Sequence, residues 1–294
     1  MQKRKREKVK VTQDSRAKLN LFLDIIQKRD DGFHEVETII APISLADHLI
    51  FRLTYKSEVK IYCTSDTLQE SENIIYKIAC FLKDTYNVKN GVEIKLKKNI
   101  PLSAGLGGGS SNAALTIQVL NSLWNLNLSL ADLHRIVSLF GSDINFFLDN
   151  KTALLCGRGE IVKDTFHTPN IENILLVNPG IEIASRNAYS WSVISKPNVE
   201  KKTAMIDAII NNDITAICKN LYNGLEQGVF AHYPILQDIK NHLIHLGAIG
   251  SLMSGSGSTV FGIFSSQEKL LVAKKFFEKY NYWLFETKIE QIEN

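Results

Sequence analysis

Apolar and polar residues alternate through several segments near the start of the chain. Residues 17–26 alternate in this way, and extended patterns recur at 34–43, 47–53 and 59–63. A period of two places successive side chains on opposite faces of a sheet, so these segments are predicted to be strands. The polar residues Lys28–Gly32 predict a turn between the first two.

Helical spacing replaces this alternation further along the chain. Apolar residues recur every three or four positions in 73–86 and 113–124, which predicts two helices with a short strand at 92–96 between them. A third helix is predicted over 129–140, where Ser129 is a candidate N-cap with an acidic residue three positions later.

The second half mixes strands and helices without regular alternation. The pattern predicts a strand at 174–177, helices across 203–228 and 234–246, a strand–glycine turn–strand at 249–264, a helix at 266–280 and a last strand. That mixture is typical of an α+β protein. The polar stretch 165–173 suggests a boundary, which divides the chain into an extension (1–14), an N-terminal domain (15–165) and a C-terminal domain (166–294).

Charge is concentrated at the N-terminus. The chain of 294 residues has a net charge of +3, but residues 1–10 hold six Lys or Arg against Glu7, a charge of +5, so the other 284 residues sum to −2. A nearly neutral body gives little reason to expect nucleic-acid binding. We expect the extension to be a solvated tail.

Cysteine usage and hydropathy favour a cytoplasmic protein. The four cysteines (Cys63, Cys80, Cys156 and Cys218) lie far apart without zinc-site spacing, which predicts apolar core thiols in a reducing compartment. No apolar run approaches the ~18 residues of a membrane span. No apolar segment follows the basic N-terminus, so no secretory signal is expected there.

A glycine-rich loop between a predicted strand and a predicted helix is the strongest local signal. It comprises Pro101, Leu102, Ser103, Ala104, Gly105, Leu106, Gly107, Gly108, Gly109, Ser110 and Ser111. Glycines let the backbone approach a ligand, and successive N–H groups at a helix start form an anion site. A flexible loop with a serine cap would have a similar composition. The Walker A and dinucleotide-binding patterns both fail here, because the required Lys-Ser/Thr or third glycine is missing.

The loop and four other motifs resemble the GHMP kinases. The motifs are Ala17–Leu23, Asp31–His34, Gly105–Ala114, Gly141–Phe147 and Gly255–Ser258, in the order of that family. The resemblance implies a two-domain α+β fold, with a ribosomal-protein-S5-domain-2-like N-terminal domain, a ferredoxin-like C-terminal domain and an active site in the cleft between them. The triple glycine with Ser-Ser-Asn-Ala-Ala points to the branch that phosphorylates a cytidine-diphosphate-linked polyol.

The resemblance implies an activity and two catalytic residues. The reaction would be ATP-dependent phosphorylation of the 2-hydroxyl of 4-diphosphocytidyl-2-C-methyl-D-erythritol, in the non-mevalonate isoprenoid pathway. Asp143 matches the general base, although after Gly141 it could also cap a short helical turn with Ser142. Lys18 matches its charge-stabilising partner, where an isolated strand lysine would ordinarily face solvent. ATP would bind the glycine loop, with Mg²⁺ near Ser110 or Ser111.

Other residues match the family's binding positions. Asn73 and Lys98 match the adenine side of ATP, although a lysine at a strand end is usually solvated. The residues that match substrate contacts are Asn20, Phe33, His34, Tyr189, Gly255, Ser256 and Gly257. Phe33 and Tyr189 would stack on the two faces of cytosine, and His34 would hydrogen-bond its edge.

The chain departs from the family pattern at two of these motifs. Phe33 replaces a common tyrosine, which retains the aromatic face and loses the phenol. Asn145 replaces a common proline two residues after Asp143, which is expected to hold that aspartate less rigidly.

Three alternatives remain open at the level of sequence. A GHMP kinase for homoserine, mevalonate or a sugar would not need the aromatic–histidine set. A non-catalytic nucleotide-binding regulator would not need both Lys18 and Asp143. The basic tail could recruit RNA or an anionic surface, although we expect no nucleic-acid or membrane partner, and a monomer or weak homodimer.

Overall fold

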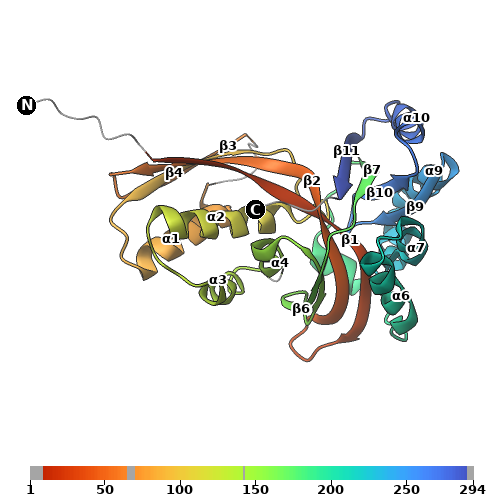
Figure 1. The fold of residues 1–294 in the computed structure, drawn as a ribbon, viewed down its shortest axis with the longest axis horizontal. Helices are drawn as coiled ribbons and strands as arrows, with labels where there is room; N and C mark the ends of the chain where they lie inside the picture. Colours follow the sequence, from red (N-terminus) through yellow and green to blue (C-terminus); the bar gives the residue numbers. More distant parts are fainter. Residues whose placement is uncertain (1–8, 65–69, 142, 290–294) are drawn as a thin grey trace, which may run out of the picture. The chain divides into compact units, whose positions relative to one another are not determined.

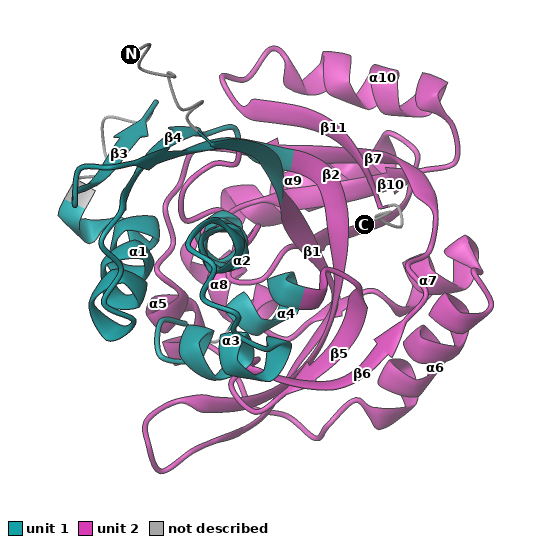
Figure 2. Ribbon diagram, turned by 60° about the vertical axis from the view of Figure 1, so that its left-hand side comes forward, with its two compact units in different colours: residues 1–15, 46–99, 108–148 teal, residues 16–45, 100–107, 149–294 magenta. Residues whose placement is uncertain are grey.

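The computed structural model describes residues 9–64, 70–141 and 143–289. Two long strands organise the chain, β1 (Lys10–Lys28) and β2 (His34–Thr54) (Figure 1). The described chain forms two compact units, and β1 and β2 each contribute to both (Figure 2). Most of the basic tail, residues 1–8, and the candidate cap Ser142 lie outside the described residues.

Strand β2 is longer than the sequence predicts. Alternation was expected to end at 43 and restart at 47, but burial alternates without a break from Ile43 through Phe51. The predicted gap at 44–46 was wrong, because Leu45 is buried between half-buried Ser44 and Ala46 and the alternation continues through all three. Strand β1 likewise begins at Lys10, inside the expected extension.

The first unit comprises residues 1–15, 46–99 and 108–148. Besides parts of β1 and β2 it contains β3 (Val59–Cys63), the 3-10 helix η1 (Glu70–Glu72), α1 (Ile74–Thr85), β4 (Gly91–Lys97), α2 (Gly108–Leu123), α3 (Leu130–Val137) and most of α4 (Ile144–Asp149). Strand β4 pairs with β2 antiparallel and with β3 parallel. Helices α1 and α2 lie side by side along this sheet (Figure 2).

The starts of two helices in this unit show where the sequence pattern predicts a helix start correctly and where it does not. The predicted cap of α3 is confirmed: Ser129 accepts a hydrogen bond from the backbone N–H of Asp132, whose carboxylate accepts one from the N–H of Ser129. Helix α2 starts at Gly108, five residues before its predicted start at 113. Glycine, serine and asparagine carry no apolar periodicity, so the pattern could not reveal this first turn.

The second unit comprises residues 16–45, 100–107 and 149–294. Its strands are β5 (Thr152–Cys156), β6 (Ile161–Phe166), β7 (Ile171–Asn178), β8 (Tyr222–Asn223), β9 (Ala248–Met253), β10 (Val260–Phe264) and β11 (Trp283–Ile289). Its helices are α5 (Ser185–Ser190), α6 (Val199–Ile210), α7 (Ile214–Asn220), α8 (Glu226–His232), α9 (Pro234–His245) and α10 (Gln267–Phe277). The helical stretch expected at 203–228 is thus three helices interrupted by β8, and α5 lies in a predicted loop.

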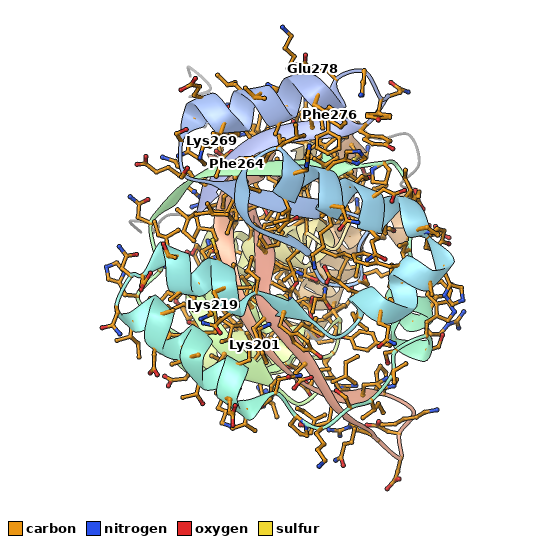
Figure 3. All side chains as sticks on the ribbon, turned by 90° about the vertical axis from the view of Figure 1, so that its right-hand side faces the viewer. Lys201, Lys219, Phe264, Lys269, Phe276 and Glu278 are labelled. Carbon is orange, nitrogen blue, oxygen red and sulfur yellow. The ribbon has the colours of Figure 1, made fainter. Side chains whose placement is uncertain are left out.

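Strand β7 is buried on both faces, which explains its continuous apolar run. Ile174 and Leu176 belong to a core shared with α6 and α7, whereas Leu175 and Val177 belong to a core shared with α8, α9 and α10. Alternate residues of a strand face opposite sides of the sheet, so helices cover both. Figure 3 labels Lys201 on α6, Lys219 on α7 and Phe276 on α10.

The cysteines match their prediction only in part. All four are thiols, but only Cys218 is buried, and burial raises its pKa to about 12. The other three are half-buried. The domain boundary placed at 165 stays a prediction, because the compact units are built from discontinuous segments.

Candidate active site

Lys18 is the centre of a buried polar cluster in the second unit. It lies on β1 and is 3% exposed. Its Nζ donates a hydrogen bond of 2.7 Å to the carbonyl oxygen of Gly105 and a second one to Oδ1 of Asn20. Asn20 in turn donates through Nδ2 to Oγ1 of Thr38 at 2.8 Å. Burial with fixed acceptors holds the lysine ammonium in one place, as a positioned charge requires.

The first glycines of the loop are held against two other segments. The backbone N–H of Lys18 donates to the Leu106 carbonyl at 3.0 Å, and Oγ of Ser254 donates to the Gly105 carbonyl at 3.0 Å. Gly105 has a φ of +74°, and a Cβ there would lie 2.0 Å from the carbonyl oxygen of Ser254. The backbone is therefore left-handed at this position and also lies close to Ser254. Only glycine, which has no Cβ, tolerates both.

Gly255 brings the C-terminal glycine motif to the same cluster. A Cβ at Gly255 would lie 3.1 Å from Nζ of Lys18 and 3.2 Å from Oδ1 of Asn20. Asn223, at the end of β8, donates through Nδ2 to the Gly255 carbonyl at 2.8 Å. Four residues predicted from three separate motifs, Lys18, Asn20, Gly105 and Gly255, therefore meet in the second unit.

The remaining loop residues begin α2 in the first unit. Gly108 is the first residue of this helix of 16 residues, so the N–H groups of its first turn need partners from outside the helix. A Cβ built on Gly109 would meet nothing within 4 Å. Ser111 is buried and its Oγ lies 2.6 Å from Oγ of Ser15. An open helix start with small residues suits a phosphate group.

Asp143 directly precedes α4, as the sequence predicts. The second residue of α4, Asn145, is 5% exposed and joins this helix to α3. Its Nδ2 donates to Oγ of Ser138 at 2.9 Å, and its Oδ1 lies 2.9 Å from Nδ1 of His134. These two side-chain contacts attach Asn145 to α3, and the expectation that Asn145 holds Asp143 less rigidly than a proline would stays a prediction.

The turn before β2 presents Phe33 to solvent. Phe33 is 52% exposed, and the guanidinium of Arg158 lies 4.8 Å from its ring centroid. Asp31 accepts the backbone N–H of Phe33 at 3.1 Å, and Arg29 forms an ion pair of 2.7 Å with Glu35. The ring is thus positioned on a braced turn with one face over a cation, and an exposed flat aromatic surface can stack on a base.

His34 and Tyr189 lie together. Their ring centroids are 5.4 Å apart with an interplanar angle of 23°, a stacked arrangement. Burial, and secondarily the charge of Lys28, lower the pKa of His34 below its usual 6.5. The imidazole is accordingly neutral near pH 7, with one donor and one acceptor nitrogen.

Asn73 and Lys98, matched to the adenine side, both have contacts within the first unit. Asn73 is the N-cap of α1, and its Oδ1 accepts the N–H of Ile75 at 3.0 Å. Lys98 forms a buried ion pair of 2.7 Å with Asp47. Burial lowers the pKa of Lys98, and Asp47 opposes that shift. Contact of either residue with adenine stays a prediction.

Several residues of the site were not predicted from the sequence, among them Ser254, Arg158 and Asp47. Ser254 directly precedes the Gly255 motif, so the motif could have been extended by one residue. Arg158 lies in the glycine turn 157–159, and nothing in the sequence around it indicates its contact with Phe33, 125 positions earlier. Asp47 gives one signal, an acid at a buried position of an alternating strand.

A groove of about 550 Å³ lies on the sheet of the first unit. Its lining comes from β2, β3 and β4 and includes Arg52, Lys95 and Lys97. Among the described residues, no group of three or more His, Cys, Asp and Glu side chains is arranged to hold a metal ion. No helix in the described ranges is long and apolar enough to cross a membrane.

Comparison with known proteins identifies relatives over nearly the whole chain. The family model of the GHMP kinases N-terminal domain matches residues 73–151, and that of the GHMP kinases C-terminal domain matches residues 205–281. A 4-diphosphocytidyl-2-C-methyl-D-erythritol kinase from Thermoanaerobacter sp. (strain X514) is 40% identical over 279 residues, which cover 94% of this chain and 95% of the relative.

Solved structures agree with the sequence comparison. A crystal structure of 4-(cytidine 5'-diphospho)-2C-methyl-D-erythritol kinase matches with a TM-score of 0.80 and 29% identity, over 96% of this chain and all of that one. A homoserine kinase from Cytophaga hutchinsonii matches with a TM-score of 0.70 at 17% identity, over 99% of this chain and 98% of that one. The second match shows a shared fold alone.

Proposed function

Because the chain belongs to the GHMP kinase family, in the branch of the 4-diphosphocytidyl-2-C-methyl-D-erythritol kinases, we propose that it transfers the γ-phosphate of ATP to the 2-hydroxyl of 4-diphosphocytidyl-2-C-methyl-D-erythritol. Phosphoryl transfer needs little covalent help from a protein, and depends on positioning and on stabilisation of charge. The residues described above supply both.

The observation that carries the proposal is the hydrogen bond from Lys18 to the Gly105 carbonyl. It attaches a buried cation to the loop proposed to bind the phosphates. An ammonium in this position stabilises the negative charge that develops as a hydroxyl attacks a phosphoryl group. Asn20 accepts a further hydrogen bond from Lys18, and we propose that it contacts the hydroxyls of the substrate.

Asp143 is the proposed general base. It lies immediately before α4, whose second residue, Asn145, is attached to α3 by two side-chain contacts. A carboxylate in reach of the substrate hydroxyl accepts its proton as the oxygen attacks the phosphorus. The pairing of Asp143 with Lys18 is part of this proposal.

The nucleotide phosphates would bind the N–H groups of Gly105–Ser111. The left-handed backbone at Gly105 and Gly107, with the open start of α2, fits an anion. Mg²⁺ bound with ATP would neutralise charge on the outer phosphates. The hydroxyl of Ser110, which is half-buried, is a suitable oxygen ligand, whereas Ser111 is already engaged by Ser15.

The cytidine group would be recognised in the second unit. We propose that cytosine stacks on the exposed ring of Phe33 and on Tyr189, with neutral His34 at its edge. In the structure Tyr189 stacks on His34, so cytosine would bind beside this pair of rings. Gly255, Ser256 and Gly257 would contact the polyol portion. We propose a cytoplasmic location, where ATP is available, and a monomer or weak homodimer without nucleic-acid partners.

ADP release coupled to a spectroscopic assay tests this function. The wild type with MgATP should release ADP only when the cytidine-linked polyol is present, and Asp143→Ala should abolish that release. Homoserine, mevalonate and a panel of sugars serve as rival acceptors. Turnover of one of these in place of the polyol would assign a sister kinase, and ATP binding without turnover of any acceptor would indicate a regulator.

A further inference from the structure

Asp47 is a buried carboxylate to which the proposed reaction gives no role. It lies on β2 at a fully buried position. Its Oδ2 accepts hydrogen bonds from Nζ of Lys98 at 2.7 Å and from Nδ2 of Asn112 at 2.9 Å. Its Oδ1 accepts the backbone N–H of Asn99 at 2.7 Å. A carboxylate with three donors, one of them a cation, is firmly held.

These partners come from three separate segments of the first unit. Asp47 belongs to β2, Lys98 and Asn99 directly follow β4, and Asn112 lies in the first part of α2. Asn99 adds a hydrogen bond from its Nδ2 to the Ala46 carbonyl at 2.8 Å. The start of α2, which begins with the glycines of the loop, is therefore attached through one carboxylate to two strands.

Asp47 also determines which way the Asn112 amide points. A carboxylate only accepts hydrogen bonds, so Asn112 must present its NH₂ group to it. The Oδ1 of Asn112 is consequently buried with no hydrogen-bond partner among the described residues. Leaving a buried acceptor unsatisfied is unfavourable, and Asn112 is 2% exposed. The hydrogen bond from Asn112 to Asp47 is therefore formed at the cost of leaving this oxygen without a partner.

We propose that Asp47 is a positioning residue for the nucleotide: through Asn112 it fixes the first turn of α2, whose N–H groups bind the ATP phosphates. This inference rests on the proposed function for the identity of the anion. Anion binding by backbone N–H groups depends on their direction, so a first turn that is free to shift binds phosphate less tightly. The ion pair of 2.7 Å with Lys98 holds the carboxylate in place.

A double-mutant cycle on Asp47 and Asn112 tests the proposal. Asp47→Asn keeps the shape and removes the charge, and Asn112→Ala removes the link to α2 while leaving the ion pair intact. Asp24→Asn is a matched control, because Asp24 is also buried and also accepts a backbone N–H, that of Asn198 at 2.7 Å, in the second unit. The dissociation constant of ATP is measured by calorimetry, beside kcat, both KM values and the melting temperature.

We expect each single variant to raise the ATP dissociation constant roughly tenfold, and the double variant to raise it no further, because both changes break the same link. The kcat at saturating ATP and the KM of the alcohol should stay within about twofold. Asp24→Asn should lower the melting temperature without changing ATP affinity.

An unchanged ATP affinity in folded Asn112→Ala would overturn the proposal, and so would additive effects in the double variant. If Asp47→Asn fails to fold, because it leaves the Lys98 charge buried, Asn112→Ala alone decides. The proposed function fails separately: wild-type protein that binds ATP and phosphorylates no polyol contradicts that function, while the affinities of the variants still decide the role of Asp47.

Discussion

The ammonium of Lys18 donates a hydrogen bond of 2.7 Å to the carbonyl oxygen of Gly105, 87 positions later in the chain. This single contact joins the first strand motif to the glycine loop. The side chain of Ser254 donates to the same carbonyl, so the C-terminal glycine motif is attached as well. Three motifs that are distant in sequence thereby meet at the carbonyl oxygen of Gly105.

Replacing the Lys18 charge should affect the chemical step. Lys18→Met retains most of the side-chain volume and removes the ammonium, so we expect kcat to fall by about 10²–10³. The control is Lys274→Met on α10, which breaks an ion pair with Glu286 away from the site and should leave kcat unchanged. Steady-state ADP release measures both, and equal kcat values for the two variants would contradict the role of Lys18.

Removing the carboxylate charge of Asp143 should separate chemistry from binding. Asp143→Asn keeps the size of the side chain but cannot accept the proton, so kcat should fall by about 10²–10⁴. ATP affinity should change little, since the phosphates are bound by the loop. Asp149→Asn, at the other end of α4, is the matched control. A variant that keeps wild-type turnover would rule out Asp143 as the base.

Two glycines of the same loop should differ in their tolerance of alanine. Gly105→Ala places a Cβ 2.0 Å from the Ser254 carbonyl at a φ of +74°, and we expect it to cost at least about 2 kcal/mol of stability. Gly109→Ala meets no atom within 4 Å and lies in α2, where alanine is favoured. Thermal denaturation should thus show a lower melting temperature for Gly105→Ala only, and similar melting temperatures would be inconsistent with this geometry.

Asn145 should be replaceable by proline better than by alanine. Asn145→Ala loses the contacts to His134 and Ser138, at about 1 kcal/mol each, and should reduce kcat several-fold by loosening Asp143. Asn145→Pro loses the same contacts but fixes φ in the first turn of α4, which proline tolerates. We expect kcat to recover in the proline variant. Identical kcat values for wild type and Asn145→Ala would show that the contacts do not position the base.

The pKa of His34 predicts a pH profile for substrate affinity. Because burial lowers this pKa below 6.5, the imidazole is neutral above that pH and gains a proton only on further acidification. The KM of the cytidine-linked substrate should be flat from about pH 8 to 6.5 and rise below. His34→Gln should have a higher KM and lose the rise. A wild-type KM that already rises above pH 7 would argue against neutral His34 as the contact.

How far the sequence predicts this molecule depends on the kind of signal. Alternation and capping locate most strands and helices, and Ser129 with Asp132 forms the predicted cap. Patterns fail where polarity and burial disagree: Asp47 interrupts the apolar alternation of β2 without interrupting the strand. They also fail at the start of α2, where glycine and serine give no period.

The candidate site shows the same division. Motifs identify Lys18, Gly105 and Gly255, and the structure places them together. Contacts such as Asp47 with Asn112, or Arg158 with Phe33, depend on which residues the fold brings close, and one sequence carries no record of that. Local chemistry is therefore predictable, whereas the side chains that hold it in position are found only in three dimensions.

The most direct test of the central claim is identification of the product. Wild-type protein is incubated with MgATP and 4-diphosphocytidyl-2-C-methyl-D-erythritol, and ³¹P NMR follows the phosphorus signals over time. We predict one new phosphomonoester, coupled to the 2-position of the polyol, that grows in step with ADP while the diphosphate signals of the substrate persist. ADP formation accompanied only by inorganic phosphate, or a phosphomonoester at another hydroxyl, would contradict the account.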